Sequence, residues 1–170
     1  IARKYQGDVK EILQFNGLPT DGRLIQGEVV IIPDGELPQS AGRSVSRPSA
    51  PGAPSYDGYY LRPVAGGVKT QGRHGYNGVD LGAAPGAPIL AAADGRVLIS
   101  RNGGWNGGYG NYVVIEHPNK TQTLYAHNQQ NIVAAGQWAV QGQVIGYVGS
   151  TGRSTGAHLH FEVRGAKNPF

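Results

Sequence analysis

The 170-residue chain contains no cysteine and no methionine, and only 15% of its residues are charged. Without cysteine there can be no disulfide and no thiolate metal site, so a metal would have to be held by His, Asp or Glu side chains. The absence of cysteine also fits an exported protein. The longest β-branched apolar run, VVII at 29–32, is far too short to cross a bilayer, so we expect no transmembrane segment in this chain.

Glycine, with 28 residues, and proline, with 11, are abundant. This composition favours a turn-rich β architecture over a helical bundle. The formal net charge of +4 favours docking on a polyanionic surface such as a bacterial wall, and it is too diffuse to indicate nucleic acid binding. Because the first residue is Ile1, we expect a processed or trimmed piece from which any leader or anchor has been removed.

Residues 1–33 differ in texture from the rest of the chain. In YQGDVKEILQFNGL, apolar residues at helical spacing predict a short helix, which Asp8 caps and Asn16-Gly17 ends. LIQGEVVIIP predicts a strand closed by Pro33. Together these stretches resemble the later part of a LysM module, a small α+β unit whose family binds N-acetylglucosamine chains. Glycan contact through this partial module is what the resemblance implies.

The changes in composition and apolar spacing along the chain predict three segments. They are a partial LysM-like module at 1–33, a Pro/Gly/Ser-rich linker at 34–57, and a β-rich domain at 58–170. The alternative for the linker is an ordered strap that lies across the following domain. In that domain, short β-like runs alternate with glycine-rich turns, and they predict a mainly β fold, a compact antiparallel sheet or open barrel. The runs are GVDLG, PILAAA, RVLIS, NYVVIEH, TQTLYAH, QVIGYVG and HLHFEVR.

All five histidines lie in this β-rich region, and two of them are two residues apart in its last predicted strand. His158 and His160 share one face of that strand with Glu162 and Arg164, because successive side chains of a strand alternate between its faces. Two imidazoles at this spacing could both reach one metal, or one could bind it while the other transfers protons. They could also be polar residues on the wet side of a half-buried strand.

Further candidates stand at the ends of other predicted strands. His74 comes six residues before Asp80, and His127 ends the run TQTLYAH. In an antiparallel sheet such positions can converge on one groove. Two histidine nitrogens and one carboxylate oxygen make a three-ligand zinc set that leaves the fourth position to water, as catalytic zinc requires. Additional histidines nearby could move protons near neutral pH. No H-E-x-x-H sequence occurs, so a glutamate base of that type is excluded.

The stretches HGYNGVDLG, APILAAADGRV, LYAH and GSTGRSTGAHLHFEVR resemble the M23 metallopeptidases, also called the LytM or lysostaphin-type family, over roughly residues 60–165. Members of this family are zinc endopeptidases that cut peptide bonds in the stems or cross-bridges of bacterial peptidoglycan. The resemblance implies that activity, a peptidoglycan peptide as substrate, and a wall-associated location in the cell envelope, periplasmic or extracellular. We expect a monomer. The alternative is a non-catalytic activator or scaffold for other wall hydrolases, since M23-like domains can lose their zinc ligands.

Carried over position by position, the resemblance makes His74, Asp80 and His160 the zinc ligands. His127 and His158 would flank the attacking water, orienting or deprotonating it and stabilising the tetrahedral intermediate. Five residues separate His74 from Asp80 where many family members have three, so we expect a longer loop between them.

Four other residues have alternative interpretations. His117, in EHPNK, matches no site position of the family and is interpreted as structural or exposed. For Glu162, a surface salt bridge is favoured over support of a histidine from behind. Trp105 and Tyr109 lie on a glycine-rich loop, where they could wall a groove, or Trp105 could only pin its loop to the barrel.

Overall fold

The chain divides into two compact units, Ile1–Pro48 and Ser49–Phe170, in this computed structural model. The residues that the structure describes are 2, 9–16, 18–19, 21–24, 30, 54–74 and 77–170, without the side chains of 11, 14–16 and 72–74. Each unit is described by itself. In the described part of the chain, no helix has the length and apolarity needed to span a membrane.

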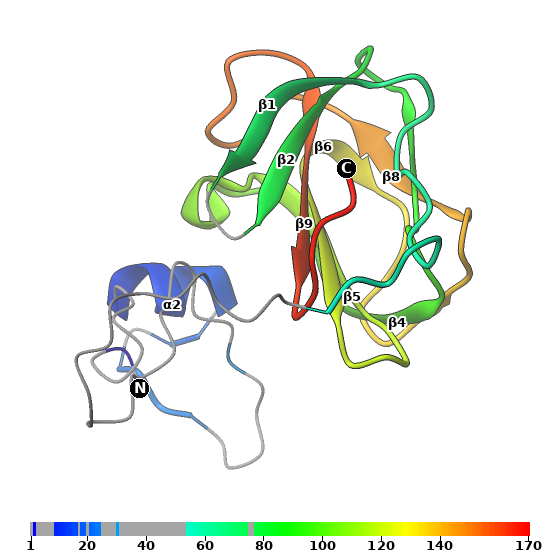
Figure 1. Ribbon diagram of the computed structural model, residues 1–170. Coiled ribbons are helices and arrows are strands. Elements are labelled where there is room, and N and C mark those ends of the chain that lie inside the picture. Colours follow the sequence, from blue (N-terminus) through cyan, green and yellow to red (C-terminus); the bar gives the residue numbers. More distant parts are fainter. Residues whose placement is uncertain are drawn as a thin grey trace, which may run out of the picture. The chain divides into compact units, whose positions relative to one another are not determined.

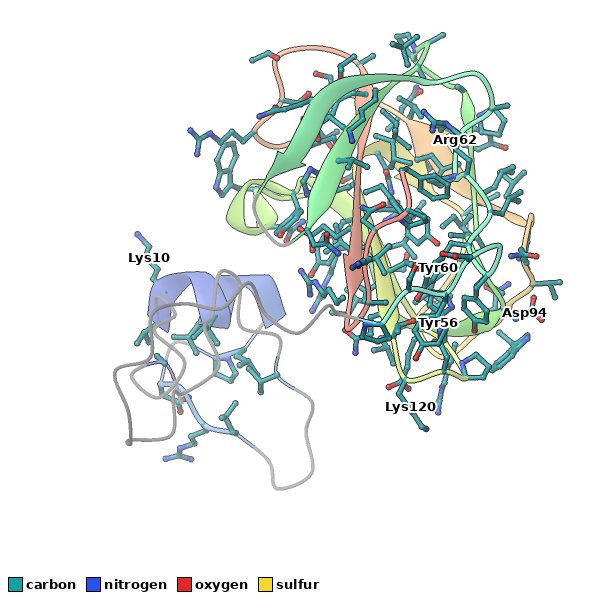
Figure 2. The ribbon with its side chains drawn as sticks, in the orientation of Figure 1. Lys10, Tyr56, Tyr60, Arg62, Asp94 and Lys120 are labelled. Atoms are coloured by element: carbon teal, nitrogen blue, oxygen red, sulfur yellow. The ribbon has the colours of Figure 1, made fainter. Side chains whose placement is uncertain are left out.

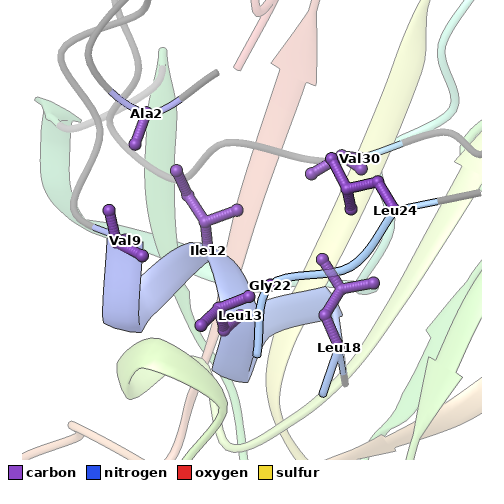
Figure 3. A pocket seen from close by; sticks show the side chains of 8 residues that line it. All are labelled: Ala2, Val9, Ile12, Leu13, Leu18, Gly22, Leu24 and Val30. Atoms are coloured by element: carbon purple, nitrogen blue, oxygen red, sulfur yellow. The ribbon is translucent and has the colours of Figure 1, made fainter. Parts of the chain in front are cut away.

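The described helix of the first unit is α2, Val9–Asn16, where the apolar spacing predicts it. Ile12 is buried, and the Leu18 N–H donates to the Leu13 carbonyl at 2.8 Å, a bond typical of a Schellman helix ending. An apolar cavity of about 210 Å³ lies beside the helix (Figure 3). Its lining residues are Ala2, Val9, Ile12, Leu13, Leu18, Gly22, Leu24 and Val30.

Several predictions for this unit fall on residues that are not described. The capping residue Asp8 and Gly17 lie outside the described residues, as do 25–29 and 31–33 of the predicted strand. The resemblance to a LysM module therefore stays a prediction. Residues 34–53 of the predicted linker also lie outside the described part.

The described strands of the second unit form one nine-stranded antiparallel sheet that curls around the core (Figure 1). The path of paired strands is β1-β2-β9-β6-β5-β4-β7, and β8 pairs with both β6 and β3. Among the described residues of this unit, a 3₁₀ turn, η1, spans Asn106–Gly108. The strands are β1 Val68–His74, β2 Gly78–Gly82, β3 Pro88–Leu90, β4 Gly95–Arg101, β5 Asn111–Glu116, β6 Gln122–Asn131, β7 Trp138–Ala139, β8 Val144–Val148 and β9 His158–Arg164.

The mainly antiparallel β fold predicted from the sequence is confirmed, and each of the seven predicted runs contains a strand. Two strands, β1 and β7, were not predicted. The strand β1 lies at one end of the pairing path, and its sequence VKTQGRH has no apolar alternation because an edge strand need not bury a face. The strand β7 has only two residues, too few for a periodic signal.

One face of β9 closes the hydrophobic core, as its alternation predicts. Leu159, Phe161 and Val163 are buried in this core. Tyr125 of β6 stands opposite Phe161, with the two ring centroids 5.3 Å apart. The other face of β9 is therefore left for its polar residues.

The long strand β6 changes its partner part-way along. Residues 122–126 pair with β9, and Ala126 stands opposite His160. From Asn128 onward β6 pairs with β8 instead. His127 lies between the two stretches and has a left-handed backbone, with φ of 63°. The strand β8 ends at Val148 and β9 begins at His158, and the loop at 149–157 connects them.

Within the second unit, the segment before β1 packs on the core: Tyr60 belongs to the core, and Tyr56 packs against it (Figure 2). At the same end lies His117, which is only 1% exposed. Its Nδ1 lies 2.8 Å from the Asp94 carbonyl oxygen, and its Nε2 lies 2.8 Å from the Thr123 hydroxyl. The structural interpretation of His117 is thereby confirmed.

We predict that His117 makes the stability of the fold depend on pH. Burial lowers its pKa from the ordinary 6.5, so below that pH the unfolded chain takes up a proton that the folded chain resists. Its contribution is complete above about pH 6.5 and is lost as the pH falls through the folded-state pKa. Urea unfolding at about pH 8, 6.5 and 5 should show a shallower loss of stability for His117→Gln than for the wild type. Equal slopes would contradict this role.

Candidate functional site

The polar face of β9 meets a carboxylate from β2. Asp80 and His160 stand directly opposite each other in the antiparallel pairing of these strands, so their side chains share a face. The Asp80 Oδ1 lies 2.8 Å from the His160 Nδ1, and both residues are buried. A carboxylate oxygen and an imidazole nitrogen therefore meet at one point.

His158 joins this pair from two residues earlier on β9. Gly82 stands opposite it on β2 and contributes no side chain. The His158 Nε2 lies 3.8 Å from the Asp80 Oδ1, and its Nδ1 lies 2.9 Å from the Gly156 carbonyl oxygen. That carbonyl can only accept, so the Nδ1–H donates to it and Nε2 is the nitrogen that faces Asp80.

His127 reaches the same place through its unusual backbone. In a regular strand it would share the core face with Tyr125, two residues before it. Its left-handed φ of 63°, a conformation that histidine adopts more readily than most residues, turns the ring to the opposite side. The ring centroid then lies 4.8 Å from that of His158 and 5.8 Å from that of His160. The backbone N–H donates to the Tyr109 carbonyl at 2.9 Å.

Each of the three histidines has one ring nitrogen anchored away from the point where they converge. The His127 Nδ1 donates to the Thr151 carbonyl at 2.8 Å, as the His158 Nδ1 does to Gly156. The anchor of His160 is a side chain, since its Nε2 lies 3.1 Å from the Glu162 Oε1. These anchors leave the Nε2 of His127 and His158 and the Nδ1 of His160 toward the site.

The electrostatics differ sharply among these rings. Burial alone would lower the pKa of His160, but its hydrogen bonds to Asp80 and Glu162 outweigh burial and raise the pKa to about 9. Burial lowers the pKa of His127 to about 4, and the neighbouring histidines add to the shift. The cation-attracting position is therefore the one between Asp80 and His160. Oxygen and nitrogen donors of this kind fit a zinc ion.

The predicted third ligand, His74, is only partly described. It is the last residue of β1, and its backbone pairs with Gly78 on β2, two residues before Asp80. Its side chain lies outside the described residues. Among the side chains that are described, no set of three or more His, Asp or Glu residues is arranged to hold a metal. The structure thus brings together Asp80, His127, His158 and His160, and the ligand role of His74 stays a prediction.

Two residues behind the site differ from the sequence-based interpretation. Glu162 is 1% exposed, so the favoured surface salt bridge is wrong: its ion pair with Arg164 is buried, and it also contacts His160. Tyr109 lies behind His160, with ring centroids 5.8 Å apart, and its hydroxyl donates to Glu162 at 2.6 Å.

Trp105 is 52% exposed on the same glycine-rich loop. The carbonyl anchors at Thr151 and Gly156 were missed because a backbone acceptor has no sequence signal.

The loop that carries these carbonyls packs backbone to backbone against the glycine-rich loop before β5. The Arg153 N–H donates to the Gly108 carbonyl at 2.7 Å. Gly152 has a φ of +70°, and a Cβ added to it would lie 2.3 Å from that same carbonyl oxygen. A side chain at Gly152 would therefore push the two loops apart and shift the anchor of His127.

Comparison with known proteins agrees with this geometry. The model of Peptidase family M23 matches residues 74–170. The chain belongs to this family. The M23 fold is also found in the catalytic domain of the prophage-encoded M23 protein EnpA from Enterococcus faecalis, with a TM-score of 0.56 and 27% identity over 62% of this chain and 86% of that chain.

Curated relatives of this M23 chain include an enzyme and an activator. The peptidoglycan DD-endopeptidase ShyC of Vibrio cholerae is 46% identical over 112 residues, which are 64% of this chain and 24% of ShyC. The murein hydrolase activator EnvC of Escherichia coli is 36% identical over 126 residues, 71% of this chain and 29% of EnvC. The chain thus spans only about a quarter of the length of these relatives.

We predict that Gly152→Ala lowers the stability of this M23 chain. The matched control is Gly58→Ala, because Gly58 has a similar φ of +74° but nothing within 4 Å of an added Cβ. The control should lose about 1–2 kcal/mol from left-handed strain alone. Gly152→Ala should have the lower thermal midpoint because of the added overlap. Equal midpoints for the two variants would refute the close approach.

Proposed function

We propose that this chain is a zinc-dependent endopeptidase that hydrolyses peptide bonds in bacterial peptidoglycan. The observation that carries the proposal is the convergence of Asp80 and His160 at 2.8 Å, with the rings of His127 and His158 on the same side of them. One carboxylate, one anchored imidazole ligand and two further imidazoles suit metal-assisted hydrolysis. Membership of the M23 family and the likeness to ShyC support the same activity.

We infer that His74, Asp80 and His160 hold the zinc ion. The pairing of β1 with β2 supports His74 as a ligand. The approach of the Asp80 Oδ1 to the His160 Nδ1 supports the other two ligands. A cysteine-free chain leaves these residue types as the donors. When bound, zinc polarises a carbonyl and lowers the pKa of a water molecule.

In this proposal, His127 and His158 transfer the proton between the attacking water and the leaving amine. Their Nδ1 atoms are occupied by the carbonyls of Thr151 and Gly156, so each presents Nε2 as an acceptor. With ring centroids 4.8 Å apart, both rings can reach one small substrate group. They flank the attacking water, accept its proton, stabilise the charge that develops, and return the proton to the leaving amine.

The substrate class and location follow from the same proposal. A formal net charge of +4 favours approach to the polyanionic wall, and the exposed Trp105 provides an aromatic surface for a peptide or glycan. We propose that the protein works in the cell envelope, as a monomer, on the peptide part of peptidoglycan. Glycan contact through the partial LysM-like module at 1–33 belongs to the proposal as well.

The second candidate is a non-catalytic activator of other wall hydrolases, as EnvC is named. An activator has no need of intact ligands or of anchored proton carriers. Here Asp80, His127, His158 and His160 are all present and face one another. This intact set favours the endopeptidase.

We predict that metal binding and turnover can be separated by mutation. Asp80→Ala should lose both zinc and activity, because it removes a ligand. His127→Ala should keep zinc and lose activity by about 100- to 10,000-fold, the usual size of acid–base catalysis. The matched control Asp57→Ala removes an exposed carboxylate outside the site and should match the wild type. Zinc content and rate are measured on all four proteins, and an unchanged rate in His127→Ala would remove its role.

Digestion of purified peptidoglycan tests the function itself. The protein is incubated with zinc, with chelator, and with zinc restored after the chelator, and released fragments are identified by mass spectrometry. We expect zinc-dependent release of peptides with new amino termini. A zinc-loaded protein that releases no peptide from several wall types would reject the endopeptidase and favour the activator.

A further inference from the structure

Glu162 is a buried carboxylate directly behind a proposed metal ligand. It stands on the polar face of β9 between His160 and Arg164, and it is 1% exposed. Gly78 lies opposite it on β2 and contributes no side chain there. Burying a carboxylate costs free energy unless both of its oxygens have partners. The contacts of Glu162 therefore indicate its role.

Both oxygens of Glu162 are engaged. The Oε1 lies 3.1 Å from the His160 Nε2 and accepts the Tyr109 hydroxyl at 2.6 Å. The Oε2 accepts the Arg164 Nε at 2.8 Å, and the Arg164 Nη2 lies at the same distance from it. Arg164 thus balances the charge of Glu162, while Tyr109 and Arg164 hold one oxygen each. These contacts fix the position of the carboxylate independently of its contact with the imidazole.

The His160 ring consequently lies between two carboxylates, one at each nitrogen. Asp80 faces Nδ1 at 2.8 Å, and Glu162 faces Nε2 at 3.1 Å. If Asp80 acted alone, the single proton of a neutral ring would be drawn to Nδ1, the nitrogen that must carry a lone pair to bind metal. A second carboxylate at Nε2 draws the proton to the other side.

We propose that Glu162 is the positioning residue of His160: it holds the Nε2–H and so presents the Nδ1 lone pair to the metal. In the metal-free protein Asp80 can also hold a proton at Nδ1; that proton would leave to solvent when a metal takes its place, while the Nε2–H would stay on Glu162. Tyr109 and Arg164 extend this role by fixing the carboxylate. The inference rests on the proposed zinc site, but the Nε2–H···Glu162 bond itself exists without zinc.

The main test compares Glu162→Gln with the matched control Glu116→Gln, the same substitution at an exposed position at the end of β5. Zinc affinity is measured by competition with a chelator, and the protonation of each His160 nitrogen by ¹⁵N NMR of histidine-labelled protein. Glu162→Gln should weaken zinc binding by about 10- to 100-fold and alter the His160 Nε2 signal. The control should change neither. A folded Glu162→Gln protein with wild-type zinc affinity would overturn the proposal.

A second variant serves if Glu162→Gln does not fold because Arg164 loses its counter-charge. Tyr109→Phe removes the hydroxyl that donates to Oε1 and leaves the Glu162–Arg164 pair in place. It should weaken zinc binding by a smaller factor and shift the His160 Nε2 signal. A purely structural role would lower the thermal midpoint alone, and that result would overturn the proposal.

The proposed zinc-dependent function and the positioning role of Glu162 can be contradicted independently of each other. If the wild type bound no zinc, the proposed function would fail. NMR of the metal-free protein would still test whether Glu162 holds the His160 Nε2–H. An Nε2–H signal typical of a carboxylate hydrogen bond, altered in the variant, would support the positioning role. Its absence from the wild type would overturn it.

Discussion

The exchange of partners along β6 is the constraint on which the site depends. This strand leaves β9 for β8 at His127, and the left-handed backbone there, with φ of 63°, turns an imidazole out of the core. Beside this point β8 ends and β9 begins, and the loop at 149–157 connects them. That loop then supplies the Thr151 and Gly156 carbonyls that anchor two of the histidines.

A second constraint is the register of β2 against β9, which sets Asp80 opposite His160. A slip of one residue would move the proposed ligands to the core face and the core residues to the site. The core itself resists that slip, because Leu159, Phe161 and Val163 are buried on the reverse of the same strand. Packing on one face thus fixes the geometry of the other. The anchors further divide the histidines: backbone carbonyls hold His127 and His158, the proposed proton carriers, whereas a buried carboxylate holds His160, the proposed ligand.

Much of this arrangement could be predicted from alternation alone. The period of two in HLHFEVR separates His158 and His160 from the core residues, and the structure has that separation. The position of His127 could not be derived so, because the left-handed turn arises from hydrogen bonds to Tyr109 and Thr151, far away in the sequence. Glu162 was misjudged for a related reason. Glu162 lies on a strand paired on both sides and accepts a hydrogen bond from Tyr109, a loop residue whose placement no local pattern reveals.

X-ray absorption at the zinc edge of the loaded protein counts the imidazoles around the metal. The proposed ligands are the imidazoles of His74 and His160, the oxygen of Asp80 and a water. With these ligands, the spectrum should show a shell of nitrogen and oxygen atoms with two imidazole rings. A shell with three or more imidazoles would mean that His127 or His158 binds the metal, and would contradict their assignment to proton transfer.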